Sequence, residues 1–196
     1  MRLLATKKGI AKYIFTMTLV CLLSISFNTH SFEQDFYQYG HTVHEQETLQ
    51  WLWRKAQKFS AIQSIYHTDC PYHLPIYMMT KSKMNKEICP DEPLHCRNFI
   101  GAYDTKAKRI LLHHGFMPEE DMIAASFLLH EFIHALQNET ISNENMLGSC
   151  ARLRIMEQAA YDGQNAFLKS EGALFRAGIG MRMMVCPSDI ALYSWF

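Results

Sequence analysis

The feature that most constrains this chain is an H-E-x-x-H pattern, His130-Glu131-Phe132-Ile133-His134, set in a run of apolar, helix-favouring residues. Residues four apart on an α-helix differ by about 40° around the axis and by about 6 Å along it, so both imidazoles can reach one ion from the same face. Glu131 points away from that pair, where its carboxylate can accept a proton from water beside the ion. Two nitrogen ligands with an adjacent base suit zinc-dependent hydrolysis, so the pattern predicts a zinc-binding helix.

The surroundings of this pattern decide between a metal site and a surface helix with two solvated histidines. Pro118 and the three acidic residues after it predict the start of the helix, because proline suits the first turn and acids stabilise the positive end of the helix dipole. One stripe along the helix then combines apolar and polar residues: Ile123, Phe127, His130, His134 and Gln137. Because the histidines continue a buried face, the metal site is favoured.

A second helix, expected from about Leu147 to Ser170, carries a candidate third ligand. Its inward stripe would be Cys150, Leu153, Glu157, Ala160, Tyr161, Gln164 and Leu168. A lone carboxylate on such a face is costly to bury, whereas one that faces a divalent cation is stabilised. Glu157 is therefore a candidate metal ligand. The alternatives are a carboxylate paired with Arg152 or Arg154, or one turned to solvent.

The chain ahead of these helices predicts one further helix and a small sheet. A capping box at Thr42 opens a helix to about Ser60, and a short strand at residues 76–80 is followed by a long loop over residues 81–97. Residues 99–113 have the pattern strand, turn, strand, and such a hairpin offers an edge to an extended peptide. With 48% hydrophobic residues, the sequence predicts one α+β domain in which the sheet packs on the two site helices.

The first 31 residues have the composition of a secretory signal peptide. They contain four basic residues and no acid, and the run from Tyr13 to Ser31 is uncharged. Its apolar centre is short for a spanning helix, although an uncleaved membrane anchor is the alternative and would attach the protein to a membrane. We expect a mature domain of residues 32–196 that is exported, periplasmic or secreted. Cleavage changes a formal charge of zero to −4, so nucleic acid is not an expected partner.

Five cysteines follow the expected signal peptide: Cys70, Cys89, Cys96, Cys150 and Cys186. In an exported domain they predict two disulfides and one remaining thiol, and the sequence leaves the pairing open, with Cys150 to Cys186 as one possibility. A metal site made by Cys89, His95 and Cys96 is disfavoured because no C-x-x-C spacing is present.

The two site segments also resemble a known class of enzyme. With residues 130–137, HEFIHALQ, and the later EQAAY from Glu157, the chain is similar to zincin metallopeptidases of the glutamate-ligand, or gluzincin, type. More narrowly it resembles exported bacterial proteins with H-E-L-V-H-x-L-Q, a cysteine and then E-x-x-A-Y-x-x-Q. The resemblance implies His130, His134 and Glu157 as ligands and Glu131 as base.

Three neighbouring patterns fit less well. The N-E-x-x-x-D signature of thermolysin-like enzymes is absent, as is the extended metzincin pattern with a third histidine. The mitochondrial inner-membrane processing peptidases share H-E-x-x-H-A, but Gln137 and the export-type start of this chain favour the bacterial group.

These observations predict a zinc metallopeptidase that acts on a peptide or protein substrate. Zinc and its three ligands would act with Glu131 as general base, and Tyr161 is the first candidate for stabilising the oxyanion, ahead of Tyr103 and His113. The alternative is an exported zinc-binding protein that binds envelope or host proteins without cleaving them. Glu131 favours the enzyme, because a pure binding site needs no base.

Overall fold

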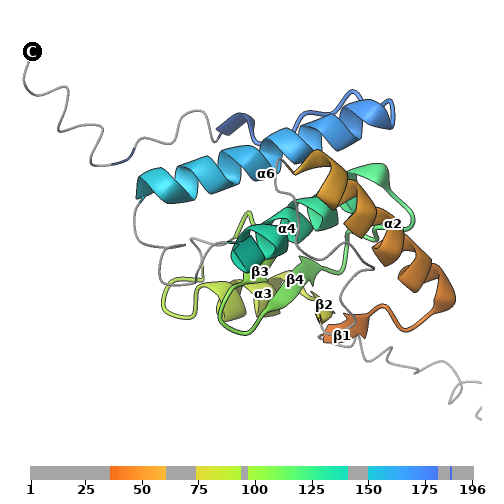
Figure 1. Ribbon diagram of the computed structural model, residues 1–196. Coiled ribbons are helices and arrows are strands. Elements are labelled where there is room, and N and C mark those ends of the chain that lie inside the picture. Colours follow the sequence, from red (N-terminus) through yellow and green to blue (C-terminus); the bar gives the residue numbers. More distant parts are fainter. Residues whose placement is uncertain (1–35, 61–73, 94–96, 141–149, 181–185, 187–196) are drawn as a thin grey trace, which may run out of the picture. The chain divides into compact units, whose positions relative to one another are not determined.

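The computed structural model describes residues 36–60, 74–93, 97–140, 150–180 and 186 (Figure 1). The expected signal peptide therefore lies outside the described residues. Within them, no helix is both long and apolar enough to cross a membrane. The elements follow in the order β1 (Phe36–Tyr39), α2 (Val43–Phe59), β2 (Ile76–Met79), α3 (Lys81–Ile88), β3 (Gly101–Asp104), β4 (Arg109–His113), α4 (Met122–Thr140) and α6 (Cys150–Ser170).

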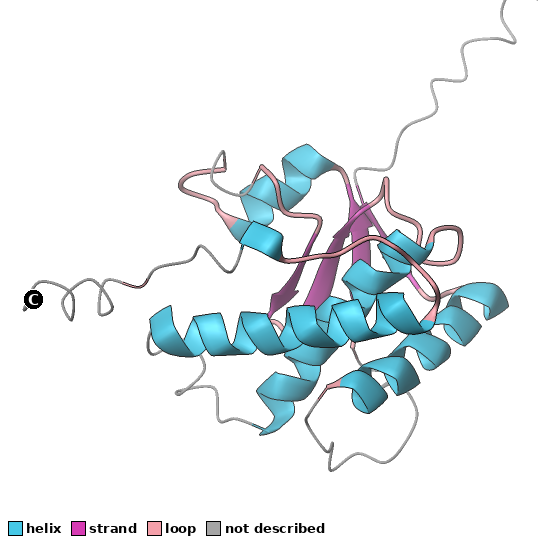
Figure 2. Ribbon diagram, turned by 90° about the horizontal axis from the view of Figure 1, so that it is seen from above, coloured by secondary structure: helices cyan, strands magenta, loops and turns pink. Residues whose placement is uncertain are grey.

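The four strands form one mixed sheet in the order β1-β2-β4-β3. β2 and β4 are parallel, with Tyr77 opposite Leu111, and the two outer pairs are antiparallel. Among the described residues β3 is thus an edge strand, as the hairpin pattern predicts. α4 lies between the sheet and α6 in Figure 1, and α6 runs crosswise to the strands when seen from above in Figure 2. The predicted α+β class is confirmed.

Helix α4 is the centre of the core. Its large apolar side chains are fully buried on several sides, and Phe132 meets the ring of Trp53 from α2 edge-on at 5.2 Å between centroids. Leu128, Leu129 and Leu136 belong to the same cluster as residues of the sheet and of α6. A helix covered on nearly all sides becomes apolar nearly all round, so the single buried stripe expected from the sequence understates its burial.

The loop expected over residues 81–97 is a wrong prediction in its first half, where α3 forms. Thr80 caps the helix by accepting a hydrogen bond from the Lys83 amide at 3.4 Å, and Met84 is fully buried against the second face of the sheet. Parallel strands need a crossover connection, and α3 is part of the one that joins β2 to β4. The charged residues that suggested a loop belong to its exposed side.

The start of α4 also differs from the prediction. The helix begins at Met122, and the residues from Pro118 to Glu120 form a turn ahead of it. Asp121 caps the helix, since its Oδ1 accepts a hydrogen bond from the Ile123 amide at 2.9 Å. Thus the acidic cluster does mark the helix start, but from outside the first turn.

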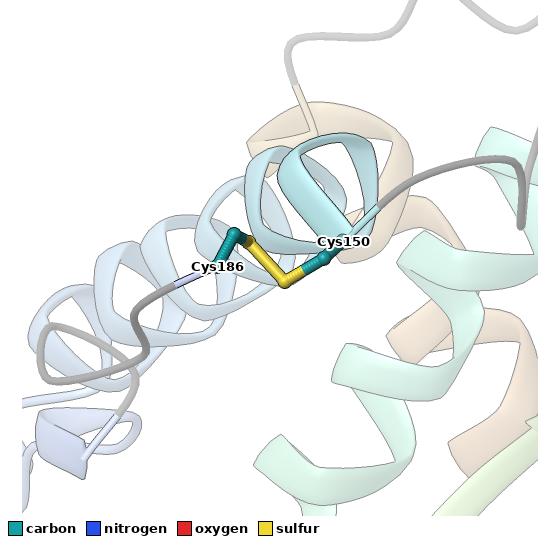
Figure 3. The surroundings of a disulfide bond; sticks show 2 residues. All are labelled: Cys150 and Cys186. Carbon is teal, nitrogen blue, oxygen red and sulfur yellow. A yellow bond between two sulfur atoms is a disulfide. The ribbon is translucent and has the colours of Figure 1, made fainter. Parts of the chain in front are cut away.

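A disulfide joins Cys150, the first residue of α6, to Cys186 (Figure 3). This confirms the one pairing suggested from the sequence. Cys89 is disulfide-bonded as well, which removes it from the alternative Cys89-His95-Cys96 metal site. Disulfides are typical of proteins in an oxidising compartment.

Candidate metal centre

Three predicted ligands come together where α4 meets α6. His130 and His134 are one turn apart on α4, and their Nε2 atoms lie 3.0 Å from each other. Glu157 reaches them from α6, with Oε2 at 3.4 Å from His130 Nε2 and Oε1 at 3.3 Å from His134 Nε2. His130 is only 6% exposed, so the alternative of solvated surface histidines is wrong. The three side chains form a group that could hold a metal ion.

The spacing of these atoms fits a small divalent ion. Ligands at the usual zinc distances in a tetrahedron are about 3.3 Å from each other, close to the three separations seen here. The two Nε2 atoms lie within hydrogen-bond distance of each other and close to the Glu157 carboxylate, so a cation bound among the three side chains would take the place of these contacts. Two nitrogens and one carboxylate suit zinc and other first-row divalent ions.

Gln137 was predicted to lie on the buried stripe of α4 and had no predicted role. Its side chain contacts His134 directly. Its Oε1 is 2.8 Å from His134 Nδ1, and its Nε2 donates a hydrogen bond to the Met156 carbonyl at 2.9 Å. The signal for this role was present in the sequence, since a residue three positions after His134 lies on the same side of the helix. Its partner on α6 could not be read from spacing.

Glu131 lies beside the triad in a tightly enclosed position. It is 7% exposed, and a Cβ atom at Gly101 on β3 would come within 3.0 Å of its Oε1. Burial raises the pKa of the Glu131 carboxyl, and the charge of Glu157 acts in the same direction, whereas the two histidines and a hydrogen bond from the Tyr103 backbone oppose the rise. A carboxylate with a raised pKa is a stronger proton acceptor near neutral pH.

The pKa of Glu157 is shifted in the opposite direction. Burial would raise its pKa, but hydrogen bonds and charge from His130 and His134 hold the pKa of this carboxyl well below its usual range. Burial would likewise lower the pKa of His134, yet interactions with Glu157 and Glu131 raise it. Glu157 is therefore present as an anion, which is the form that binds a cation.

The three candidates for oxyanion stabilisation lie in different places. The Tyr161 ring packs against the His130 ring at 4.4 Å between centroids, and burial followed by the charges of Glu157 and Glu131 raises the pKa of its hydroxyl. Tyr103 also lines the cavity beside the triad, where its hydroxyl accepts a hydrogen bond from Asn138. His113 stacks on His114 at the end of β4 and is not among the described residues of the cavity wall.

The triad opens into a cavity of about 390 Å³ between β3 and α6. Polar residues that line it include His130, Glu131, His134, Glu157, Tyr161 and Gln164, and several apolar side chains line it as well: Ile88, Phe99, Phe127, Leu153 and Met156. Gly101, Ala102 and Tyr103 of β3 also line it. Glu131, the three candidate metal ligands and an edge strand therefore line the same cavity.

The fold and site define a class of centre, namely a two-histidine, one-carboxylate group on an α+β scaffold. Comparison with known proteins adds no family to this description: no family model matches the chain, and no curated protein or solved structure is significantly similar to it.

Proposed function

We propose that this chain is an exported zinc metallopeptidase of the zincin type. The observation that carries the proposal is the position of Glu131, a buried carboxyl with a raised pKa that shares a cavity with His130, His134 and Glu157. A site that only stored or sensed a metal would gain nothing from a second carboxylate held next to the ligands and outside the ligand group. The arrangement suits hydrolysis by an activated water molecule.

Each residue of the candidate site has a separate role in the proposed hydrolysis. His130, His134 and Glu157 would hold the zinc, which would lower the pKa of a water molecule and polarise the peptide carbonyl. Glu131 takes the proton from the attacking water and returns it to the leaving amine. The Tyr161 hydroxyl, kept protonated by its raised pKa, donates a hydrogen bond to the carbonyl oxygen as negative charge develops there.

The walls of the cavity support a peptide as substrate. β3 is at the edge of the sheet, so an extended segment can pair with its backbone and pass in front of Glu131. Among the described wall residues, the carboxylates are Glu131 and Glu157, and the mechanism uses both. Phe99, Phe127, Leu153 and Met156 remain for side-chain contacts, and they favour a large uncharged residue next to the cleaved bond.

Export is part of the proposal. The bonded cysteines support folding in an oxidising compartment, in keeping with the signal-type composition of the first 31 residues. The expected location is the periplasm or the exterior of the cell.

The decisive experiment is digestion of a peptide library by three proteins: the original chain, Glu131→Gln, and Glu120→Gln as a control at an exposed position. We expect cleavage by the original and control proteins, its loss in the presence of a chelator, and its loss in Glu131→Gln with zinc content unchanged. Equal cleavage by Glu131→Gln would overturn the assigned base. Zinc binding without cleavage by any of the three proteins would instead favour the zinc-binding protein that recognises its partners without hydrolysis.

The third ligand is tested by metal analysis of Glu157→Gln. An amide is a weaker ligand than a carboxylate and carries no charge, so we expect zinc affinity to fall by at least tenfold. Unchanged stoichiometry and affinity would exclude Glu157 from the ligand group.

A further inference from the structure

We propose that two buried glutamines, Gln137 and Gln164, are positioning residues that fix the two histidines with Nε2 toward the metal. The inference rests on the proposed metal site and extends it to the interface of α4 and α6. A histidine has two ring nitrogens, and the hydrogen bond made by one decides which is left to bind a metal. Gln137 Oε1 contacts Nδ1 of His134, and we infer that Gln164 Oε1 serves Nδ1 of His130.

For His134 the contact is direct. The Met156 carbonyl can only accept, so the Gln137 side-chain NH₂ group faces it and Gln137 Oε1 faces His134 Nδ1 at 2.8 Å. That oxygen can only accept, so Nδ1 carries the proton and Nε2 presents its lone pair to the site. Because Met156 precedes Glu157, the same side chain also joins α4 to the turn of α6 that carries the third ligand. Gln137 is 2% exposed, so water does not compete strongly for these bonds.

For His130 the evidence is a buried ring nitrogen, Nδ1, and a buried amide oxygen, Gln164 Oε1, that each lack a hydrogen-bond partner among the described residues. Ser126 donates its hydroxyl proton to the Ile123 carbonyl at 2.7 Å, so it must accept from Gln164, whose Nε2 lies 2.9 Å away. This fixes the amide with Oε1 as its remaining polar atom. Gln164 Oε1 and His130 Nδ1 are both buried, and neither has a hydrogen-bond partner among the described residues.

The two atoms also belong to the same neighbourhood. His130 is one turn after Ser126 on α4, and Gln164 is close to one turn after Tyr161, whose ring packs on His130. Gln164 and His130 line the same cavity wall. When Nε2 binds a metal, Nδ1 carries the ring proton and needs an acceptor. Gln164 Oε1 does not bond to it in this structure, and we infer that it provides the acceptor through one water molecule.

The choice of amides has a chemical consequence. A carboxylate in either place would add negative charge next to the site, whereas glutamine orients the ring and leaves the charge unchanged. The ligands then contribute one negative charge, that of Glu157, and a bound divalent ion keeps a net positive charge with which to polarise a carbonyl.

The test combines zinc affinity with the tautomer of each ring. Gln137→Leu and Gln164→Leu remove one acceptor each, and Gln158→Leu is the control on the outer part of α6, where Gln158 bonds to Asp162. Zinc dissociation constants are measured by chelator competition, and ¹⁵N-labelled histidine rings are observed by NMR with and without zinc at alkaline pH. We expect roughly 10- to 100-fold weaker zinc binding in both site variants, and no change in the control.

The ring spectra separate this inference from the proposed function. In the original protein we expect His134 to carry its proton on Nδ1 even without metal, and a proton on Nε2 would overturn the role of Gln137. Gln137→Glu keeps the acceptor for Nδ1 but loses the donor to the Met156 carbonyl, so it should bind zinc more tightly than Gln137→Leu does, which a purely structural role would not predict. Tight zinc binding by Gln137→Leu and Gln164→Leu with unchanged rings would reject the inference, while absence of zinc binding by the original protein would reject the metal site itself.

Discussion

At the scale of single residues, the candidate site keeps two nearby carboxylates in different states. Burial and the neighbouring charge of Glu157 raise the pKa of Glu131, whereas the two histidines hold that of Glu157 down. Pairs of groups whose environments separate their pKa values are suited to separate tasks. Here one carboxylate suits proton transfer and the other suits binding of a cation.

The close approach of Gly101 to Glu131 gives a prediction about the base. In Gly101→Ala, the new Cβ would lie 3.0 Å from both Glu131 Oε1 and Leu112 Cδ2, so the carboxylate has to move. We expect peptide hydrolysis to fall by about 10-fold, because the carboxylate has to give by a few tenths of an ångström and the rate depends steeply on the position of a reacting group. Zinc affinity should stay the same. Gly180→Ala, which meets no atom within 4 Å, is the control, and equal losses in the two variants would contradict this explanation.

The sequence predicted the residues of the site better than their supports. His130, Glu131 and His134 follow from helical spacing, and Glu157 follows from a carboxylate on an apolar face, so local pattern was sufficient for bringing them together. The contacts of Gly101 with Glu131 and of Gln137 with Met156 join segments that are distant in the chain. No periodicity encodes such contacts, and the tertiary structure is needed to find them.

At the scale of elements, the accuracy of prediction depended on whether the stabilising interactions are local. The capping box of α2 and the hairpin turn were predicted correctly because their hydrogen bonds join near neighbours, such as Thr42 with Glu45. α3 was missed because it is stabilised by burial of Met84 against the sheet. The sequence of this short, highly charged segment does not indicate that burial. α4 was assigned correctly as a helix but starts later than expected.

The turn between β3 and β4 gives a prediction about pH and stability. Burial would raise the pKa of Asp104, but hydrogen bonds from the Ala107 and Lys106 amides and from Arg109 lower it. A lowered folded-state pKa means that the ionised group stabilises the fold above its unfolded value of about 4, and that this contribution is lost as the pH falls through the folded value.

We therefore expect Asp104→Asn to lower the free energy of unfolding by about 1 kcal/mol at pH 7, because it removes the charge and retains an acceptor. The difference from the original protein should shrink as the pH is lowered from 7 to about 2, because the aspartate becomes protonated in the folded state as well once the pH falls through its lowered pKa. Urea unfolding at both pH values measures this, with Asp91→Asn, at an exposed position, as the control. A difference that is the same at both pH values would refute the assignment.

At the scale of the molecule, the candidate centre depends on parts of the chain that are far apart. The two histidines come from α4, Glu157 comes from α6, and the wall opposite them belongs to β3. The segment after α6 returns to the site, since Ala177 exchanges two hydrogen bonds with the Asn165 side chain and Gly178 packs on the Tyr161 ring. The disulfide between Cys186 and Cys150 then joins the chain after this segment to the start of α6.

Removal of that disulfide should therefore weaken the fold more than the ligand group. Cys150 and Cys186 are 36 positions apart, and opening a loop of that length costs about 4 kcal/mol if the effect is mainly on the entropy of the unfolded chain. We expect the double variant Cys150→Ser, Cys186→Ser to unfold at a lower urea concentration by a corresponding amount, while zinc affinity under native conditions changes less than threefold. An unchanged midpoint, or loss of zinc binding in the folded variant, would contradict this expectation.

The burial of α4 on nearly all sides limits how this protein can diversify. A substitution on that helix changes the hydrophobic core, the ligand group or the base, so few of its positions can vary independently of stability. New specificity, whether by natural variation or by engineering, has to come from the surrounding wall, at residues such as Phe99 and Leu153 that line the cavity from other segments. The candidate metal ligands on α4 and α6 would then stay the same, while the side chains that contact a bound molecule vary around them.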